Sequence, residues 1–429
     1  MTQNLSKAVL CLLPLALLCS LAHGQDIPAV TSAPRFTGFQ LPTELGSLSY
    51  SLSLAERVRT GYYGKSGDIW ATDISGNAAY LSRSETRPFT MVYSGGYLYN
   101  SGGVQSQVFQ NFSISQNIST RLWNTTISDQ VSYLPEAPSS GLSGIPGVGD
   151  VGVNPPAGGG NPGQDILSNT GQRISNTANI NVQRQLTGST AVSGMGSYFI
   201  QKFLTATTNA VDLDDITVGG GLSHRIDALS NVEGNYNYSH FAYEGQNFSF
   251  STQKITLGYT KQINRLLSVN GSAGPQIVSS GGSSVAGSTV NLTVDAGLKY
   301  TGERSSYSAD YTRGVRGGSG VIQGTFINNF IAQGNRQLGE FMRLSGSGSY
   351  TRNTSVQNLT TQPFTFQTVV GNVEVERTVA QNFNAFVSYS LQYQNSSTSV
   401  ANTIAFTGTS QTFGFGITYS PRQVHLGHQ

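Results

Sequence analysis

Long stretches in which apolar and polar residues alternate are the most regular feature of this sequence. Every second residue is apolar in residues 290–300, and the same alternation holds in residues 383–393 with Phe386 as its one exception. Residues 412–419 alternate in the same way. A period of two is typical of β-strands with one apolar face. These runs exceed the roughly five or six residues of most soluble strands and match the about 9–11 residues of a tilted transmembrane strand.

The alternation and the spacing of turn residues together predict about 18 strands. No part of the chain after residue 24 carries a capped apolar stripe of helical period, so the predicted fold class is all-β. The expected strands lie near residues 47–59, 68–83, 88–99, 105–118, 119–134, 172–186, 189–203, 214–228, 230–244, 248–263, 265–280, 288–302, 304–317, 320–335, 339–353, 365–379, 382–397 and 408–421.

The connections between these strands differ on the two sides. Links after even-numbered strands are short, such as residues 227–229 and 302–304. Links after odd-numbered strands are often longer and rich in Gly, Ser and Asn, such as residues 279–288 and 353–364. This asymmetry is typical of a transmembrane antiparallel up-and-down β-barrel, here of about 16–18 strands, with both termini on the periplasmic side. A propeller would instead show a recurring corner motif, which the sequence lacks.

The N-terminus has the three parts of a secretory signal peptide. Lys7 supplies the positive charge, residues 8–21 form an apolar core, and small residues precede a cleavage position before Gln25. The apolar core is shorter than the about 20 residues that a transmembrane helix needs. Neither Cys11 nor Cys19 follows a small residue, as a lipoprotein cysteine would. Cleavage would leave a chain without cysteine, and so without disulfides.

The expected organisation of the chain follows from these patterns. It comprises a signal peptide (1–24), a short periplasmic segment (25–45), a β-barrel (46–421) with a long loop at 135–170, and a C-terminal tail (422–429).

The charge content supports a membrane location over a soluble one. Charged residues make up 11% of the chain, whereas a soluble domain carries about 25%. The 24 basic and 22 acidic residues nearly balance. This balance argues against a nucleic-acid partner, because such proteins need a basic surface to neutralise phosphates.

The last expected strand carries a motif that resembles a known signal. It reads TFGFGITY, residues 412–419, and resembles the C-terminal assembly signal of bacterial outer-membrane β-barrel proteins. The motif positions are filled by Thr412, Gly414, Ile417 and Tyr419. The resemblance implies an integral protein of the bacterial outer membrane that the barrel-insertion machinery recognises. The chain departs from the family pattern by continuing through residues 420–429 after the aromatic residue.

The long loop at 135–170 stands apart in composition. Its first part, residues 135–163, contains six prolines and many glycines, which exclude a central strand. Two alternatives stay open. The segment is either a disordered external loop or, as the resemblance to porins implies for a loop after the fifth strand, a segment folded into the lumen as a constriction.

Several charged residues fall on strand faces opposite the apolar ones. A basic residue facing lipid at mid-bilayer costs about 2–4 kcal/mol, so we expect these charges to point into the lumen, with solvated rim positions as the alternative. Their mixed signs predict weak ion selectivity. The aromatic residues Tyr236, Tyr238, Phe241 and Tyr243 are expected to form part of an interfacial girdle. The lumen-facing candidates are Lys254, Asp295, Lys299, Asp310, Arg343, Glu374 and Glu376.

No grouping of residues points to catalysis, a metal or a cofactor. His425 and His428 lie three apart in the tail, and His224 and His240 lie at opposite ends of neighbouring expected strands. No helix follows the Gly-rich stretches, so they are not phosphate-binding loops. We therefore expect no enzymatic activity, no metal and no cofactor.

The predicted size of the barrel indicates a function. A barrel of about 16–18 strands keeps an aqueous channel unless it is plugged, which favours a porin-like channel for passive diffusion of small polar solutes. The alternatives are a non-conducting surface scaffold, the barrel component of an export or secretion assembly, and a released β-protein. Expected partners are outer-membrane lipid and the barrel-insertion machinery, with a homo-oligomer as an open alternative and no nucleic acid.

Overall fold

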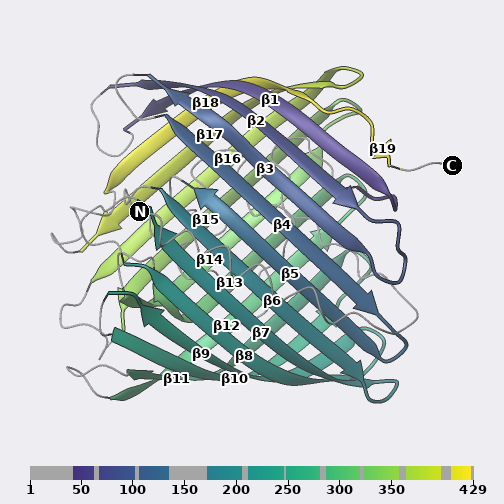
Figure 1. The fold of residues 1–429 in the computed structure, drawn as a ribbon, viewed down its shortest axis with the longest axis vertical. Helices are drawn as coiled ribbons and strands as arrows, with labels where there is room; N and C mark the ends of the chain where they lie inside the picture. The colour runs from purple at the N-terminus through teal and green to yellow at the C-terminus, as the bar shows by residue number, and fades with distance from the viewer. Residues whose placement is uncertain are drawn as a thin grey trace, which may run out of the picture.

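The computed structural model of this protein is an antiparallel β-barrel that closes on itself (Figure 1). It describes residues 42–61, 67–101, 106–134, 172–204, 211–245, 248–280, 287–318, 323–356, 364–397 and 407–426. The strands are β1 (Ser47–Thr60), β2 (Ile69–Leu81), β3 (Phe89–Asn100), β4 (Gln107–Ser119), β5 (Trp123–Leu134), β6 (Arg173–Gln185), β7 (Thr190–Phe203), β8 (Leu213–Arg225), β9 (Ser230–Tyr243), β10 (Phe248–Gln262), β11 (Leu267–Ser280), β12 (Ser288–Thr301), β13 (Ser305–Gly318), β14 (Gln323–Gln337), β15 (Met342–Ser355), β16 (Thr365–Ala380), β17 (Phe383–Ser396), β18 (Gly408–Tyr419) and the short β19 (Val424–His425).

The structure confirms the predicted fold class and all 18 expected strands, each within a few residues. Strands β1 to β18 pair in chain order, and β1 pairs with β18 from Leu52↔Tyr419 to Thr60↔Gln411, which closes the barrel. Within the described ranges, no helix has the length and apolar character that a membrane-spanning helix requires.

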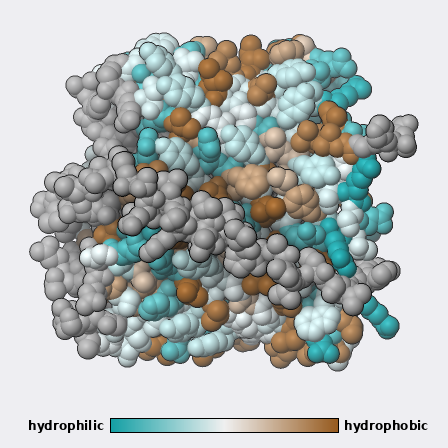
Figure 2. Space-filling model, in the orientation of Figure 1, coloured by the Kyte–Doolittle hydropathy of each residue, from teal (hydrophilic) through white to brown (hydrophobic). Residues whose placement is uncertain are grey.

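The two faces of the barrel wall differ in chemistry. Along β1 the odd-numbered residues are buried and the even-numbered ones are more exposed. The exposed face carries large apolar side chains, such as Leu257 at 68% and Val290 at 70% exposure. The buried face carries mostly Ser, Thr, Asn and Gln. Apolar side chains lie outward and polar ones inward, as a bilayer requires because hydrocarbon offers no hydrogen-bond partners. Figure 2 shows brown apolar residues spread over the outer wall.

The tight turns after even-numbered strands share a local device. The side chains of Thr187, Asp227 and Asn264 each accept hydrogen bonds from backbone N–H groups two or three residues on. Such side-chain turns satisfy donors that would otherwise be unpaired. The bond from the Leu229 N–H holds the pKa of Asp227 below its usual range. These turns lie at the same end of the barrel as the start of β1 and the end of β18.

The tail beyond β18 forms a short strand that pairs with the start of β1. Val424 and His425 form β19 and pair with Leu48 and Ser47 at the start of β1. The Leu426 N–H donates to the Gly46 carbonyl at 2.9 Å, and the Arg83 guanidinium donates to the Leu426 carbonyl at 2.6 Å. Pairing of β18 with β1 begins only at Leu52, so the tail supplies a partner to the part of β1 that β18 does not reach.

Ending the chain after Pro421 is expected to weaken the closure of the barrel. The change removes these two hydrogen bonds and the β19 pairing, and we expect a loss of about 1–2 kcal/mol. The temperature at which the folded band converts to the unfolded band on a gel measures it. A chain that ends after Leu426 keeps all of these contacts and serves as the control. Equal conversion temperatures for the two truncations would contradict the prediction.

Candidate functional site

All seven charged residues that the sequence places toward the lumen lie at strand positions whose alternation puts them on the inner face. Lys254 on β10 and Asp295 on β12 form an ion pair across β11, with Nζ and Oδ2 at 3.6 Å. Arg343 on β15 lies directly opposite Glu376 on β16. Lys299 and Asp310 are exposed on the same inward faces of β12 and β13. Glu374 is 4% exposed.

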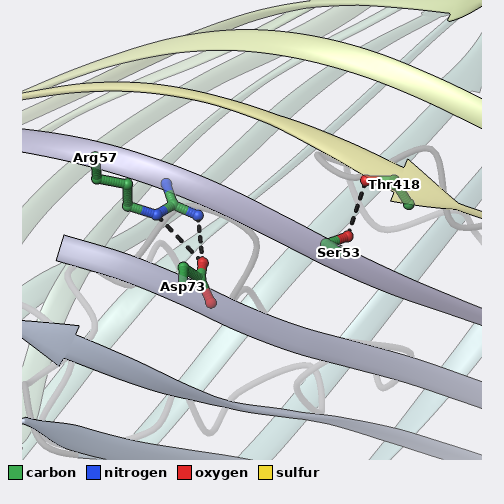
Figure 3. A network of polar contacts seen from close by, with 4 residues as sticks. All are labelled: Ser53, Arg57, Asp73 and Thr418. Carbon is green, nitrogen blue, oxygen red and sulfur yellow. Dashed lines mark hydrogen bonds and ion pairs between the residues drawn. The ribbon is translucent and has the colours of Figure 1, made fainter.

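An ion pair that the sequence reasoning missed lies beside the barrel closure. The guanidinium of Arg57 on β1 donates to Asp73 Oδ2 on β2 from Nη2 at 2.6 Å and from Nε at 3.2 Å (Figure 3). Both side chains are buried, at 3% and 2% exposure. Ser53 on β1 shares a hydrogen bond of 2.8 Å with Thr418 on β18 (Figure 3). Polar side chains thus tie β1 to both neighbours on the inner face.

Arg57 also lies in a row of paired inner-face residues that crosses from β1 through β18 and β17 to Glu374 on β16. It lies opposite Gly414 on β18, which lies opposite Ser388 on β17, which lies opposite Glu374 on β16. A Cβ at Gly414 would be 2.8 Å from Ser388 Oγ and 3.5 Å from Arg57 Nη1. A side chain at Gly414 would therefore crowd the Ser388 hydroxyl, whereas its contact with Arg57 would be an ordinary one.

Replacing Asp73 by Asn is expected to destabilise the barrel strongly. Removing one partner of a buried ion pair leaves the other charge uncompensated, which costs about 3–5 kcal/mol. The double variant Arg57→Met/Asp73→Leu removes both charges, and we expect it to regain most of this loss. Thermal conversion of the folded band on gels reports both values. A double variant that is less stable than Asp73→Asn would contradict the explanation.

The wall between β12 and β13 is only partly paired. Their pairing runs from Thr301↔Ser306 to Val294↔Arg313 and stops there. Beyond Arg313, β13 lies against the inner faces of β11 and β12, because side chains from these faces contact its backbone. We call residues 313–318 and 323–327 the inward hairpin. Its two arms pair with each other through Gly318↔Gln323.

Three side chains from the inner faces of β9, β11 and β12 hold the inward hairpin. Gln276 on β11 accepts from the Val315 N–H at 2.8 Å and donates to the Val315 carbonyl at 3.1 Å. The Thr293 hydroxyl donates to the Arg313 carbonyl at 2.8 Å. The Tyr243 hydroxyl on β9 accepts from the Gly324 N–H at 3.0 Å and donates to the Gly317 carbonyl. Gln276 thus supplies the two bonds that a neighbouring strand would otherwise make.

An apolar cluster fills the space between the inward hairpin and the wall. Phe241 and Phe250 stack with ring centroids 4.6 Å apart, and Tyr243 lies beside them. The cluster lies at the barrel end opposite the tight turns, where the odd-numbered strands finish. Its buried members are Phe199, Val211, Leu213, Phe241, Tyr243, Phe250, Val278, Val315 and Val356, with Phe248 and Phe326 packed against them.

The prediction that four aromatic residues of β9 belong to an outward-facing girdle is wrong for two of them, Phe241 and Tyr243. Tyr236 is exposed on the outer face at 44%, and Tyr238 shares that face. Phe241 and Tyr243 are buried at 5% and 3% on the inner face. The step from Tyr238 to Phe241 spans three residues, and an odd step reverses the face of a strand. The alternation of faces along a strand could therefore have placed Tyr236 and Tyr238 on one face and Phe241 and Tyr243 on the other.

The remaining expectations have different outcomes. The segment 135–163, for which a lumen constriction was one alternative, lies outside the described residues. Of the assembly-signal positions, Thr412 and Gly414 lie inward, and Ile417 is exposed on the outer face with Tyr419. Among the described residues, the inward hairpin enters the lumen, and the sequence reasoning had no signal for it.

Comparisons with known proteins find likeness in structure but not in sequence. No protein-family model matches the chain, and no curated protein sequence does. The crystal structure of OccK2 (OpdF) from Pseudomonas aeruginosa matches with a TM-score of 0.44 and 11% identity over 88% of this chain and 98% of that chain. OccAB3 of Acinetobacter baumannii matches with a TM-score of 0.42 and 10% identity over 88% and 99%. The outer membrane protein opdK of P. aeruginosa matches with a TM-score of 0.42 and 8% identity over 89% and 100%.

Proposed function

We propose that this protein is a porin-like channel of the bacterial outer membrane through which small polar solutes diffuse passively. The observation that carries the proposal is a closed barrel of 18 strands with an apolar outer face and a polar, charge-bearing inner face. In barrels of about this size side chains do not fill the interior. Export through a cleaved signal peptide at residues 1–24 is part of the proposal.

In this proposal the inward hairpin forms a constriction of the channel. It occupies lumen space at the end opposite the tight turns, where the apolar cluster packs it against the wall. The polar inner wall continues past it with Arg57, Asp73 and Glu374 on one side and Lys254 and Asp295 on the other. Charges of both signs on the lining favour small solutes that carry both donors and acceptors over ions of one sign.

A second candidate is a barrel that does not conduct. The apolar cluster favours it, because a wall folded onto its own inner face is a means of closing a lumen. Such a barrel would serve as a surface scaffold or as part of an export assembly.

Swelling of liposomes that contain the refolded protein separates the two candidates. The assay compares neutral sugars of increasing size, with heat-modifiable gel migration as the check that the barrel has formed. The channel proposal predicts fast swelling with the smallest sugars and a sharp decline with size. Folded protein that gives no swelling with any sugar would overturn the channel and leave the second candidate.

A further inference from the structure

Four basic side chains form a row on the outer face, near the end of the barrel that carries the tight turns. Each continues a line of exposed apolar residues on its strand, as Arg184 follows Ile180 on β6 and Lys261 follows Leu257 on β10. The four residues occupy the same place in four hairpins, and each pairs across its hairpin with an apolar residue. We call these four residues the basic belt, and their pairs are Arg184↔Val192, Lys261↔Val269, Arg336↔Leu344 and Arg377↔Ala385.

The positive charge of the basic belt is not balanced on its own face. All four side chains are exposed, and none forms a salt bridge with another residue of the described ranges. Along the described parts of β5 to β17, no acidic side chain lies on the outer face at this level. Acidic residues at this end lie on the inner face or in the turns, where Asp227 is close enough to Lys261 to interact with it electrostatically. The acidic turn residues Asp227, Glu303 and Glu340 are accompanied by the basic turn residues Arg265 and Arg304.

The outer face at the opposite end has a different charge pattern. Its outward-facing basic residues, Lys202 and Arg352, are accompanied by the acidic residues Asp212, Asp214 and Glu244. The Nζ atom of Lys202 lies 3.2 Å from Glu244 Oε1, so the charge of this lysine is paired. Uncompensated positive charge is therefore a property of the tight-turn end and not of the whole outer face.

Aromatic residues place the basic belt at the headgroup level of a bilayer. Trp123 on β5 pairs with Arg184, whose guanidinium lies over the indole ring at 5.1 Å. Tyr300 on β12 shares the outer face with Leu298, and β12 lies between the strands of Lys261 and Arg336. Trp and Tyr concentrate where a membrane meets water, and basic side chains reach the same region with their apolar stems along the wall.

We propose that the basic belt binds the phosphate groups of anionic phospholipids in the membrane leaflet at the tight-turn end. Guanidinium and ammonium groups donate charge-assisted hydrogen bonds to phosphate oxygens, and an anionic lipid surface attracts basic residues beside it. The belt faces away from the lumen and adjoins apolar wall, so its ligand needs acyl chains as well as a phosphate, which a soluble anion lacks. The inference rests on the proposed membrane location and not on the conduction of solutes.

The two tryptophans of the chain supply a reporter and its control. Trp123 lies beside Arg184, whereas Trp70 is exposed on the outer face at the start of β2, at the opposite end. The refolded protein is placed in phosphatidylcholine bilayers in which part of the lipid is phosphatidylglycerol or phosphatidylcholine with brominated chains, which quench tryptophan fluorescence. Each intensity is divided by that in the same lipid without bromine.

We expect a lipid preference at one tryptophan only. In Trp70→Phe, the remaining Trp123 should select phosphatidylglycerol over phosphatidylcholine about fivefold, the gain from one basic residue beside an anionic surface. In Trp123→Phe, the remaining Trp70 should show no preference. Equal quenching of Trp123 by the two lipids, or the same preference at both tryptophans, would overturn the proposal.

Charge variants test whether the basic belt carries the preference. In Trp70→Phe, Arg184→Gln is expected to bring the quenching by the two lipids close to equal. Lys299→Gln removes a positive charge from the inner face near the same end, and we expect it to leave the preference unchanged. Heat-modifiable gel migration identifies the folded fraction of each variant. A folded Arg184→Gln protein that keeps the full preference would contradict the assignment.

A second reporter extends the test along the belt. In a protein with both tryptophans replaced by Phe, Tyr300→Trp reports from between Lys261 and Arg336. We expect the same preference for phosphatidylglycerol there, and its loss in Lys261→Gln/Arg336→Gln. No preference at this position would restrict lipid binding to Arg184 and overturn a belt.

Conductance separates this inference from the proposed channel. Folded protein that selects phosphatidylglycerol but passes no current in a planar bilayer would keep the basic belt and remove the channel. Folded protein in which neither lipid quenches either tryptophan would overturn the membrane location and the basic belt together.

Discussion

Gly274→Ala is expected to prevent the barrel from reaching its folded form. Gly274 lies on β11 where this strand passes very close to β10, and a Cβ there would overlap the carbonyl oxygen of Ile255 and lie 2.9 Å from its carbonyl carbon. Both atoms belong to the backbone, so no side-chain rotation relieves the clash. Overpacking in rigid surroundings costs about 1–3 kcal/mol, and a forced separation of two paired strands belongs at or above the upper end. Gel migration of the refolded protein without heating measures the folded fraction.

The same strand offers the matched control. A Cβ at Gly271 would lie 3.9 Å from the Asp295 carbonyl oxygen, which is an ordinary contact. Gly271→Ala is therefore expected to fold as the wild type does. Equal folded yields for the two alanine variants would show that β10 and β11 do not approach each other in this way.

Gln276→Leu is expected to release the inward hairpin and to raise the conductance of the channel. The substitution leaves the buried N–H and carbonyl of Val315 without partners, and each such loss costs about 1–3 kcal/mol. A change of about 1.4 kcal/mol alters a population tenfold, so losing both bonds shifts the hairpin strongly toward a released position. The wider lumen is then measured directly as a larger single-channel current.

Gln392→Leu is the control for this experiment. Gln392 lies on the inward side of β17, outside the inward hairpin, so its replacement removes a similar amide from the lining without freeing β13. If Gln276→Leu and Gln392→Leu gave the same current as the wild type, the hairpin would not be what narrows the passage.

The strand positions could be predicted because each strand of a transmembrane barrel faces two different solvents. Apolar and polar residues therefore alternate in segments such as residues 290–300 and 383–393. The turns can be recognised by residues such as Asp227 and Asn264, whose side chains accept hydrogen bonds from backbone N–H groups two or three residues on. The inward direction of Lys254 and Asp295 follows from the same rule, because only one face can hold charge at low cost.

The inward hairpin could not be predicted in this way. Val315 and Phe326 alternate along β13 and β14 as ordinary outward residues would, and nothing local marks the point at which β13 leaves β12. The departure depends on Gln276, Thr293 and Tyr243, which come from other strands. Contacts between residues distant in the sequence leave no periodic signal in either segment.

The ion pair of Arg57 and Asp73 was missed for a different reason. Residues 56–59 carry charge on both faces of β1, since Glu56 bonds to Thr72 on the outer side while Arg57 points inward. Because charged residues occur on both faces here, the alternation of charged and apolar positions that identifies the other lumen residues is not visible in this segment. The run of Ser47, Ser49, Ser51 and Ser53 on the same face as Arg57 was the signal that could have assigned it.

The most direct test of the proposed channel is the current through a single molecule. The mature chain is refolded in detergent, its heat-modifiable form is isolated, and it is added to a planar lipid bilayer under a fixed voltage. The proposal predicts stable, uniform current steps from the folded fraction and none from the heated fraction. Folded protein that inserts but passes no current, both as the wild type and as Gln276→Leu, would contradict a channel and leave only the closed barrel.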